Sequence, residues 1–246
     1  MRLLTLFLYG IFDLALKRHT TRDQQAEWLH RYCALVLRKM GISVRYEGTF
    51  PERGVLITNH IGYLDIVALA SLHPCVFVAK SEMRRWPLLG WMTTTVGSVY
   101  VARGSGGSAV RAARGMREAA EAGVPVVCFP EGTTSNGASV LPFHSGLLMQ
   151  SLEAAAPITP AYIRYRLLED SGPGVSVEDD VSYWGKVLLL KHVFRALALR
   201  GIEVDIHFAE GPIEFAAALN ERKLVAAEAR EAVMSLSGVR DPVVAD

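Results

Sequence analysis

The sequence lacks a long uninterrupted apolar run and has few cysteines. No window holds the ~18 or more consecutive apolar residues that a conventional membrane-spanning helix requires. The three cysteines, Cys33, Cys75 and Cys128, are odd in number, and each lies in apolar surroundings. Their spacing excludes a disulfide framework and a zinc site. It predicts reduced, buried thiols in a cytoplasmic setting.

A strong charge of either sign is also lacking, because 26 Lys and Arg residues stand against 25 Asp and Glu residues. The charge is unevenly spread. Residues 1–53 hold nine basic and five acidic residues, and residues 80–117 hold seven basic residues and one acidic residue. Such a basic excess suits membrane headgroups, phosphates or nucleic acid, although ordinary solvated faces explain it equally well. No nucleic-acid partner is expected, because the Arg-rich segment 111–117 has no interleaved aromatic residues.

The chain opens with an apolar segment from Leu3 to Leu16, which ends in the basic residues 17–19. This segment is short for a bilayer span, and no small-residue cleavage site of a signal peptide follows it. Residues 22–40 place apolar side chains at spacings of three and four and predict a second helix. We expect residues 1–40 to form a helical hairpin that lies on, or dips into, one membrane leaflet. The alternative is a hairpin packed on its own domain.

Beyond residue 40, short apolar strands alternate with helical segments, which predicts one α/β domain over residues 41–246. Its sheet should be mostly parallel or mixed and flanked by helices. Segment 157–165 contains prolines that a strand tolerates only at a sheet edge or a strand end. Residues 169–180, rich in acidic residues, Gly and Ser, predict a loop. The expected strands are 42–48, 54–59, 75–80, 98–103, 124–130, 157–165 and 202–210, and the expected helices begin near residue 63 and cover 85–97, 108–123, 145–155, 184–201 and 221–236.

The stretch "ITNHIGYLDIVAL", residues 57–69, places polar residues between a predicted strand and a predicted helix. Two residues five apart on a straight helix differ by about 140°, so His60 and Asp65 can meet only if His60 lies in the preceding turn. Asp65 could then accept the Nδ1–H of His60 and leave Nε2 bare to take a proton from a substrate hydroxyl. Asn59 could hold the turn through its side-chain amide. A structural cap beside a hydrogen-bonded histidine is an equally good explanation of this pair.

A second polar stretch, "FPEGTTSNG" at residues 129–137, directly follows another predicted strand. It is a glycine-containing turn that carries Glu131, Thr133, Thr134 and Ser135. Turns of this kind offer backbone N–H groups and hydroxyls to an anion. The stretch therefore predicts a binding site for a negatively charged group.

"NHIGYLD", "GSVYVAR" and "FPEGTTS" occur in this order and are followed by "APITPAYI". This combination resembles the glycerolipid acyltransferase family typified by bacterial 1-acylglycerol-3-phosphate acyltransferases, over about residues 40 to 215. The resemblance implies transfer of an acyl chain from acyl-CoA or acyl-carrier protein to a lysolipid hydroxyl, without metal or other cofactor. It implies an enzyme at the cytoplasmic face of the inner membrane, peripheral or monotopic. The alternative outside catalysis is a peripheral membrane-binding module.

The resemblance also implies roles for particular residues. His60 is the general base and Asp65 orients it. Arg103, which ends "GSVYVAR", and Lys80, which closes the strand "CVFVAK", are the candidate ligands of an acceptor phosphate. The acceptor site would be shaped by four residues of the second polar stretch: Glu131, Gly132, Thr133 and Thr134. Without the resemblance, the sequence alone would explain Lys80 and Arg103 as solvated residues at strand ends. It would explain Glu131 as the cap of a helix or turn.

Two positions depart from the family's pattern. Many phosphate-accepting members have Arg where this chain has Thr134, and Lys where it has His144. A threonine cannot replace the charge and the bidentate fork of an arginine. Because Lys80 and Arg103 remain, the sequence favours lysophosphatidic acid as acceptor, with phosphatidic acid as product. Lyso-ornithine lipid or another lysophospholipid is the alternative acceptor.

Overall fold

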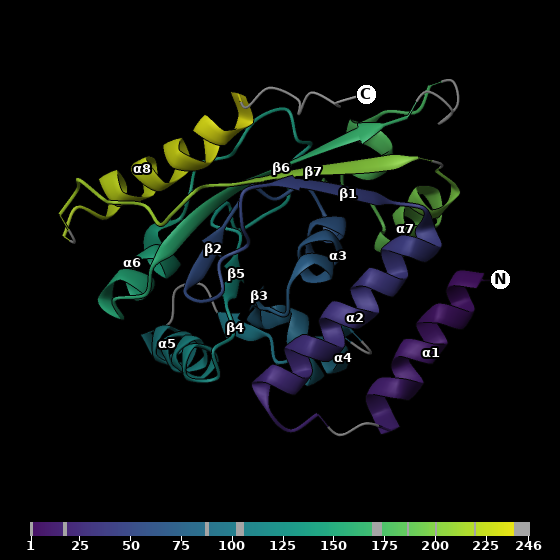
Figure 1. The fold of residues 1–246 in the computed structure, drawn as a ribbon, viewed down its shortest axis with the longest axis horizontal. Helices are drawn as coiled ribbons and strands as arrows, with labels where there is room; N and C mark the ends of the chain where they lie inside the picture. Colours follow the sequence, from purple (N-terminus) through teal and green to yellow (C-terminus); the bar gives the residue numbers. More distant parts are fainter. Residues whose placement is uncertain are drawn as a thin grey trace.

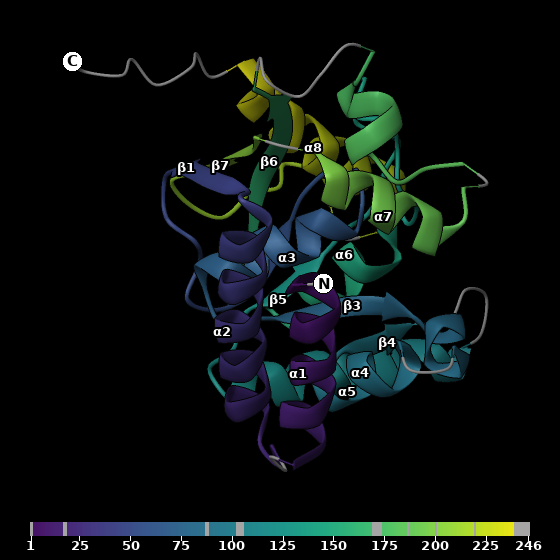
Figure 2. The same ribbon diagram turned by 90° about the vertical axis from the view of Figure 1, so that its right-hand side faces the viewer.

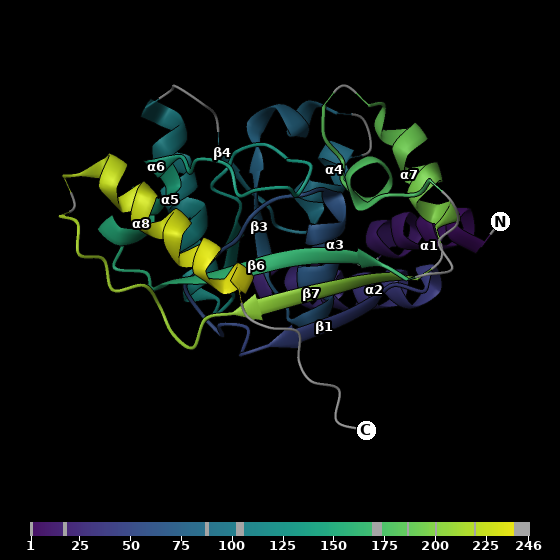
Figure 3. The ribbon, with the colours of Figure 1, turned by 90° about the horizontal axis from the view of Figure 1, so that it is seen from above.

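The computed structural model describes residues 2–16, 19–86, 89–101, 106–168, 174–185, 187–199, 201–218 and 220–238. These residues build a seven-stranded sheet in the order β1-β7-β6-β2-β5-β3-β4. Its neighbouring strands are parallel except for β6 and β7, which run antiparallel side by side (Figures 1 and 3). The mixed sheet predicted from the alternation of strands and helices is confirmed. The strands are β1 Ser43–Glu47, β2 Val55–Ile57, β3 Val76–Lys80, β4 Val99–Val101, β5 Val126–Cys128, β6 Ile158–Leu167 and β7 Ile202–Phe208.

Helices cover both faces of the sheet (Figure 1). One face packs on α2 and α3, and the opposite face packs on α5, α6 and α8. The central strands are buried on both sides, so their side chains alternate between two cores: Leu56 enters the first, whereas Val55 and Ile57 enter the second. The helices are α1 Arg2–Leu16, α2 Arg22–Met40, α3 Tyr63–Leu72, α4 Leu89–Thr95, α5 Gly106–Glu121, α6 Ser145–Glu153, α7 Leu189–Ala198 and α8 Arg222–Ser235; short 3₁₀ turns are η1 Ser81–Arg85 and η4 Leu236–Gly238, and η3 Val177–Val181 is a π-helical turn.

The first two helices form the predicted hairpin, but they differ in how they are packed. Helix α2 contributes Cys33 and Leu37 to the same core as the sheet. Helix α1 packs more loosely, with Leu14 beside Trp28 of α2, while its Phe12 is 65% exposed. Figure 2 shows α1 beside α2, on the side of the molecule that faces the viewer. Among the helices of the described residues, none combines the length and apolar character needed to cross a bilayer.

Strand β6 is central, and its prolines lie at its start, the second of the two expected places. Pro157 directly precedes the strand, and Pro160 lies just before Ala161, the first residue that pairs with β7. Two local expectations are corrected. The predicted loop 169–180 ends in the π-helical turn η3, where the Ser176 side chain accepts the Asp179 N–H. Helix α7 begins at Leu189 rather than at residue 184, because Gly185 takes a left-handed conformation (φ 72°) and Leu188 is still extended (ψ 124°).

Candidate active site

The turn between β2 and α3 lies beyond the carboxyl end of a central strand, where ligands gather in sheets of this type. Asn59 holds this turn to the neighbouring strand β6. Its Nδ2 donates to the Ile163 carbonyl at 2.9 Å, and its Oδ1 accepts the Ile163 N–H at 2.8 Å. The Thr58 hydroxyl donates to the same Oδ1 at 3.1 Å. The buried amide thus fixes the backbone that carries the next residue, His60.

His60 and Asp65 are brought together as the spacing predicted. The Nδ1 of His60 lies 2.8 Å from Oδ2 of Asp65, which is fully buried. The same Oδ2 accepts the backbone N–H groups of Ile61 at 2.7 Å and Gly62 at 3.0 Å. Because a carboxylate only accepts hydrogen bonds, Nδ1 carries the proton and Nε2 is left as the acceptor. Asp65 is therefore at once the cap of α3 and the partner of His60, so the structural and functional explanations of the pair hold together.

The imidazole of His60 is partly exposed, and one of its nitrogens is unpaired among the described residues. Its side chain is 16% exposed, and within the described parts of the chain Nε2 has no hydrogen-bond partner. The ring stacks on Phe129 with 3.9 Å between ring centroids. One face of the imidazole is thus packed, and the partly exposed ring keeps one nitrogen that no described residue binds. A side chain in this arrangement can take a proton from a group that approaches from solvent.

The turn after β5 meets the backbone of His60 from the other side. Oε1 of Glu131 accepts the His60 N–H at 3.2 Å, and the Ser135 N–H donates to the His60 carbonyl at 2.9 Å. Gly132 turns the chain between them with a left-handed φ of 63°, which favours glycine. The two polar stretches seen in the sequence therefore form one hydrogen-bonded unit around His60.

Glu131 is buried to an unusual degree for a carboxyl group, with only 2% of its surface exposed. Its Oε2 has no hydrogen-bond partner among the described residues. Burial raises the pKa of Glu131 to about 7, and Asp65 adds to the increase, while the N–H groups of His60 and Leu141 oppose it. A carboxyl group in such surroundings changes between its protonated and ionised forms close to neutral pH.

The remaining predicted residues lie at the same edge of the sheet but are less fixed. Lys80 ends β3 with an exposed side chain, Thr133 is exposed, and Thr134 is half-buried. Within the described ranges, these three side chains have no hydrogen-bond or ion-pair partner. Arg103 lies outside the described residues. The structure therefore brings Asn59, Asp65 and Glu131 to His60 and leaves Lys80, Thr133 and Thr134 as surface groups.

Two features of the site were missed by the sequence reasoning. The Tyr165 hydroxyl, on β6, donates to Oδ1 of Asp65 at 2.7 Å and is buried with it. It lies 100 residues from Asp65 in sequence, and no local pattern signals the contact. The second feature is a contact between the residues that join η3 to α7 and the turn after β2. Tyr183 donates its N–H to the Ile61 carbonyl at 3.0 Å.

A histidine with a structural role lies beside this contact. His192 of α7 lies with its Nε2 2.8 Å from the Ser182 carbonyl and its Nδ1 3.1 Å from the Tyr63 hydroxyl. Nε2 is therefore the donor, and Nδ1 accepts the tyrosine proton. Burial lowers the pKa of His192, which keeps the ring neutral. Both ring nitrogens form hydrogen bonds within the fold, so His192 is not a second general base.

Comparisons with known proteins give a consistent result. The family model described as "Acyltransferase" matches residues 41–164. A lyso-ornithine lipid O-acyltransferase of Pseudomonas aeruginosa is 36% identical over 165 residues, covering 65% of this chain and 62% of that protein. Another, of Brucella abortus, is 31% identical over 211 residues, covering 82% and 78%. A 1-acyl-sn-glycerol-3-phosphate acyltransferase of Neisseria gonorrhoeae is 34% identical over 133 residues, covering 54% and 52%.

The chain thus spans less than two thirds of the length of the Pseudomonas and Neisseria relatives. Among solved structures, the 1-acyl-sn-glycerophosphate acyltransferase PlsC of Thermotoga maritima is similar with a TM-score of 0.59. The similarity covers 98% of both chains at 20% sequence identity. At that identity, the likeness concerns the fold alone.

Proposed function

The chain belongs to the acyltransferase family, and we propose that it moves a fatty acyl chain from a thioester, acyl-CoA or acyl-carrier protein, to the free hydroxyl of a lysolipid. The observation that carries this proposal is the oriented His60, whose Nδ1–H is bound by Asp65 and whose Nε2 is open. A base in this form suits a hydroxyl substrate. No serine or cysteine nucleophile is needed, because the acceptor brings its own oxygen.

The geometry supports a direct transfer. Nε2 of His60 takes the proton of the acceptor hydroxyl while the hydroxyl oxygen attacks the thioester carbonyl carbon. The tetrahedral intermediate collapses with cleavage of the carbon–sulfur bond, and the imidazolium returns its proton to the leaving thiolate. Asp65 stabilises the imidazolium that forms between the two steps. The products are the acylated lipid and the free thiol. We expect no metal or other cofactor.

For the acceptor, we propose lyso-ornithine lipid as the first candidate. Two relatives with this name are 36% and 31% identical to the chain, and Thr134 leaves the turn without the charge of an arginine. Lysophosphatidic acid, which the sequence alone favours, is the second candidate. It is supported by the Neisseria relative and by the exposed Lys80 at the same edge of the sheet. Both acceptors offer a hydroxyl to the same base.

We propose that a membrane surface presents the acceptor, at the cytoplasmic face of the inner membrane. Helix α1 exposes Phe12 and Leu16, each by 65%, and the start of α7 exposes Leu188 by 75%. The views agree that α1 and α7 lie at the same end of the molecule, on the right in Figures 1 and 3 and towards the viewer in Figure 2. Apolar side chains gathered on one side of a protein mark an interaction surface.

The membrane contact can be tested with Phe12→Ser combined with Leu16→Ser. We expect the binding of anionic vesicles to fall about tenfold or more, because two apolar side chains no longer enter the bilayer. Exposed apolar residues on other elements, Tyr46→Ser combined with Leu224→Ser, provide the matched control. Equal sedimentation of both variants with vesicles would show that α1 is not the anchor.

The reaction is tested with purified wild-type protein, a labelled acyl donor and three acceptors presented in vesicles: lyso-ornithine lipid, lysophosphatidic acid and lysophosphatidylethanolamine. Formation of the diacyl or acyloxyacyl product from at least one of them is the expected result. Vesicle binding without turnover of any acceptor, by folded protein and with either thioester donor, would instead favour a membrane-binding module.

A further inference from the structure

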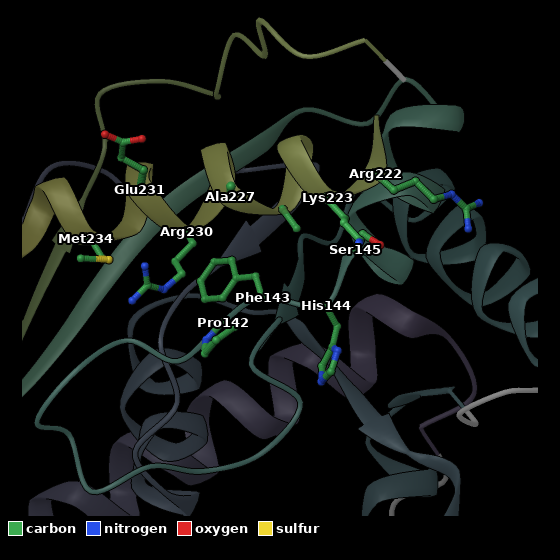
Figure 4. A pocket seen from close by; sticks show the side chains of 11 residues that line it. Pro142, Phe143, His144, Ser145, Arg222, Lys223, Ala227, Arg230, Glu231 and Met234 are labelled. Carbon is green, nitrogen blue, oxygen red and sulfur yellow. The ribbon is translucent and has the colours of Figure 1, made fainter. Parts of the chain in front are cut away.

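A second concave site lies beside the turn that carries Glu131. It is a groove of about 600 Å³ between α8 and the segment 142–145 that leads into α6 (Figure 4). The His144 N–H donates to the Pro130 carbonyl at 2.8 Å. Arg230 of α8 donates to the Val140 carbonyl at 2.7 Å. The first bond attaches one wall of the groove to the turn that carries Glu131, and the second attaches α8 to the segment that follows this turn. The groove is therefore a fixed neighbour of the proposed reaction centre.

The two ends of the groove differ. Figure 4 shows Arg222, Lys223 and His144 towards one end and Phe143 near the middle. Met234 lies towards the other end with Glu231 and with Arg230, whose guanidinium donates to the Val140 carbonyl. Arg222 and Lys223 are exposed, and neither has a hydrogen-bond or ion-pair partner in the described parts of the chain. A single carboxylate, Glu231, lines the groove. It lies nine residues further along α8 than Arg222, or about 13 Å along the helix axis.

The backbone adds to the positive potential at the cationic end. Arg222 and Lys223 lie in the first turn of α8, and Ser145 begins α6 after His144, whose side chain does not cap the helix. The N-terminal turns of helices carry partial positive charge and unpaired N–H groups. Two free cations and two helix starts thus meet at one end of a cavity with an apolar floor, a combination that fits an anionic ligand with a flat apolar part.

We propose that this groove binds the nucleotide end of a coenzyme A thioester, with its phosphates at Arg222 and Lys223 and its adenine against Phe143. The inference rests on the proposed function, in which a thioester donor is consumed. The pantetheine arm of such a donor is long and flexible, so its phosphates can lie away from the thioester that reaches His60. A groove of this size matches a small nucleotide better than the convex surface of a carrier protein.

The proposal is tested by titrating coenzyme A itself into wild-type protein and into Arg222→Ala combined with Lys223→Ala, using calorimetry. Both positions are exposed in a helix, where alanine is well tolerated, so the variant should fold. We expect its affinity for coenzyme A to fall about ten- to a hundredfold. The matched control is Arg38→Ala combined with Lys39→Ala, which removes an exposed Arg–Lys pair from α2 and should bind coenzyme A like wild type.

Steady-state kinetics then test which part of the donor the groove binds. The double variant of α8 should have a raised KM for acyl-CoA and an unchanged rate with acyl-pantetheine, which lacks the nucleotide and the phosphates. Unchanged coenzyme A affinity in the α8 variant, or an equal loss in the α2 control, would overturn the proposal. A loss seen only with acyl-carrier protein as donor would also overturn it and would assign the groove to the carrier. Because the titration needs no turnover, its result tests binding in the groove separately from the proposed reaction.

Discussion

Two neighbouring turns at the carboxyl edge of the sheet differ in how their polar side chains are held. In the turn after β2, Asn59 and Asp65 are buried and use their side-chain oxygens in hydrogen bonds within the fold. In the turn after β5, Thr133 is exposed and Thr134 is half-buried, and no described residue binds their side chains. The polar side chains of the first turn are therefore fixed as part of the fold. The two threonines of the second turn are not, and we propose that they contribute to recognition of the headgroup.

Glu131 belongs to the second turn in sequence but to the first in its contacts. It is buried and accepts the N–H of His60, whereas Thr133, two residues later, is exposed. Within the stretch "FPEGTTS", Glu131 and Ser135 are thus bonded to the backbone of His60, whereas Thr133 and Thr134 between them are not. Substitutions of the two threonines should change which lipid is used. Substitutions of the residues that hold His60 should change whether the reaction proceeds at all.

The largest effect is expected for His60→Ala. Loss of a general base typically lowers the rate ~10² to 10⁴-fold. The fold should survive, because the contacts of Asp65 with Ile61, Gly62 and Tyr165 remain. The measurement is the rate of acyl transfer by the purified variant, with circular dichroism and vesicle binding as controls. A variant with wild-type activity would remove His60 from the mechanism.

A smaller effect is expected for Tyr165→Phe, which deletes one of the hydrogen bonds of Asp65 and keeps the ring. Loss of a hydrogen bond to a charged group costs about 1.5 to 3 kcal/mol. We expect kcat to fall about three- to tenfold with little change in the KM of either substrate, and a lower free energy of unfolding. Phe129→Leu, which alters the packing of His60 without touching Asp65, gives a comparison. A raised KM without a fall in kcat would show that Tyr165 acts on binding instead.

The smallest effect concerns stability and pH at Glu131. Its pKa of about 7 in the folded protein lies above the ordinary value of 4.5, because burial disfavours the charged form. Between these two values the unfolded chain loses the proton and the folded protein keeps it, so the contribution of this group to stability decreases as pH rises. The free energy of unfolding of wild type should therefore decrease from pH 5 to pH 7 more than that of Glu131→Gln. Denaturant titrations at both pH values measure this, and parallel changes in the two proteins would contradict it.

The sequence predicted the parts of this molecule that depend on neighbours along the chain. The contact between His60 and Asp65 follows from a turn followed by a helix start, and it is observed. The family resemblance drawn from three short motifs is confirmed. Contacts across the sheet could not be predicted, because they depend on which strands pair. The central place of β6 is such a case, and the contact of Tyr165 with Asp65 follows from it.

The same limit applies to the basic and polar residues of the acceptor site. The motifs placed Lys80 and Thr134 at the same edge of the sheet as His60. A side chain without a fixed partner, however, has no single orientation that a pattern could specify. The groove beside α8 was not predicted either. Its walls come from segments 142–145 and 222–234, which are far apart in sequence and meet only through the packing of α6 on α8.

The distinction between a fixed catalytic turn and a free acceptor turn is tested most directly by one ratio: kcat/KM for lyso-ornithine lipid divided by kcat/KM for lysophosphatidic acid. It is measured for wild type, His60→Ala and Thr134→Arg. We predict that His60→Ala lowers both values ~10² to 10⁴-fold and leaves their ratio unchanged. Thr134→Arg should shift the ratio about tenfold towards lysophosphatidic acid, since its added charge binds phosphate and fills the space of a larger headgroup. A ratio unmoved by Thr134→Arg, or shifted by His60→Ala, would contradict this division of roles.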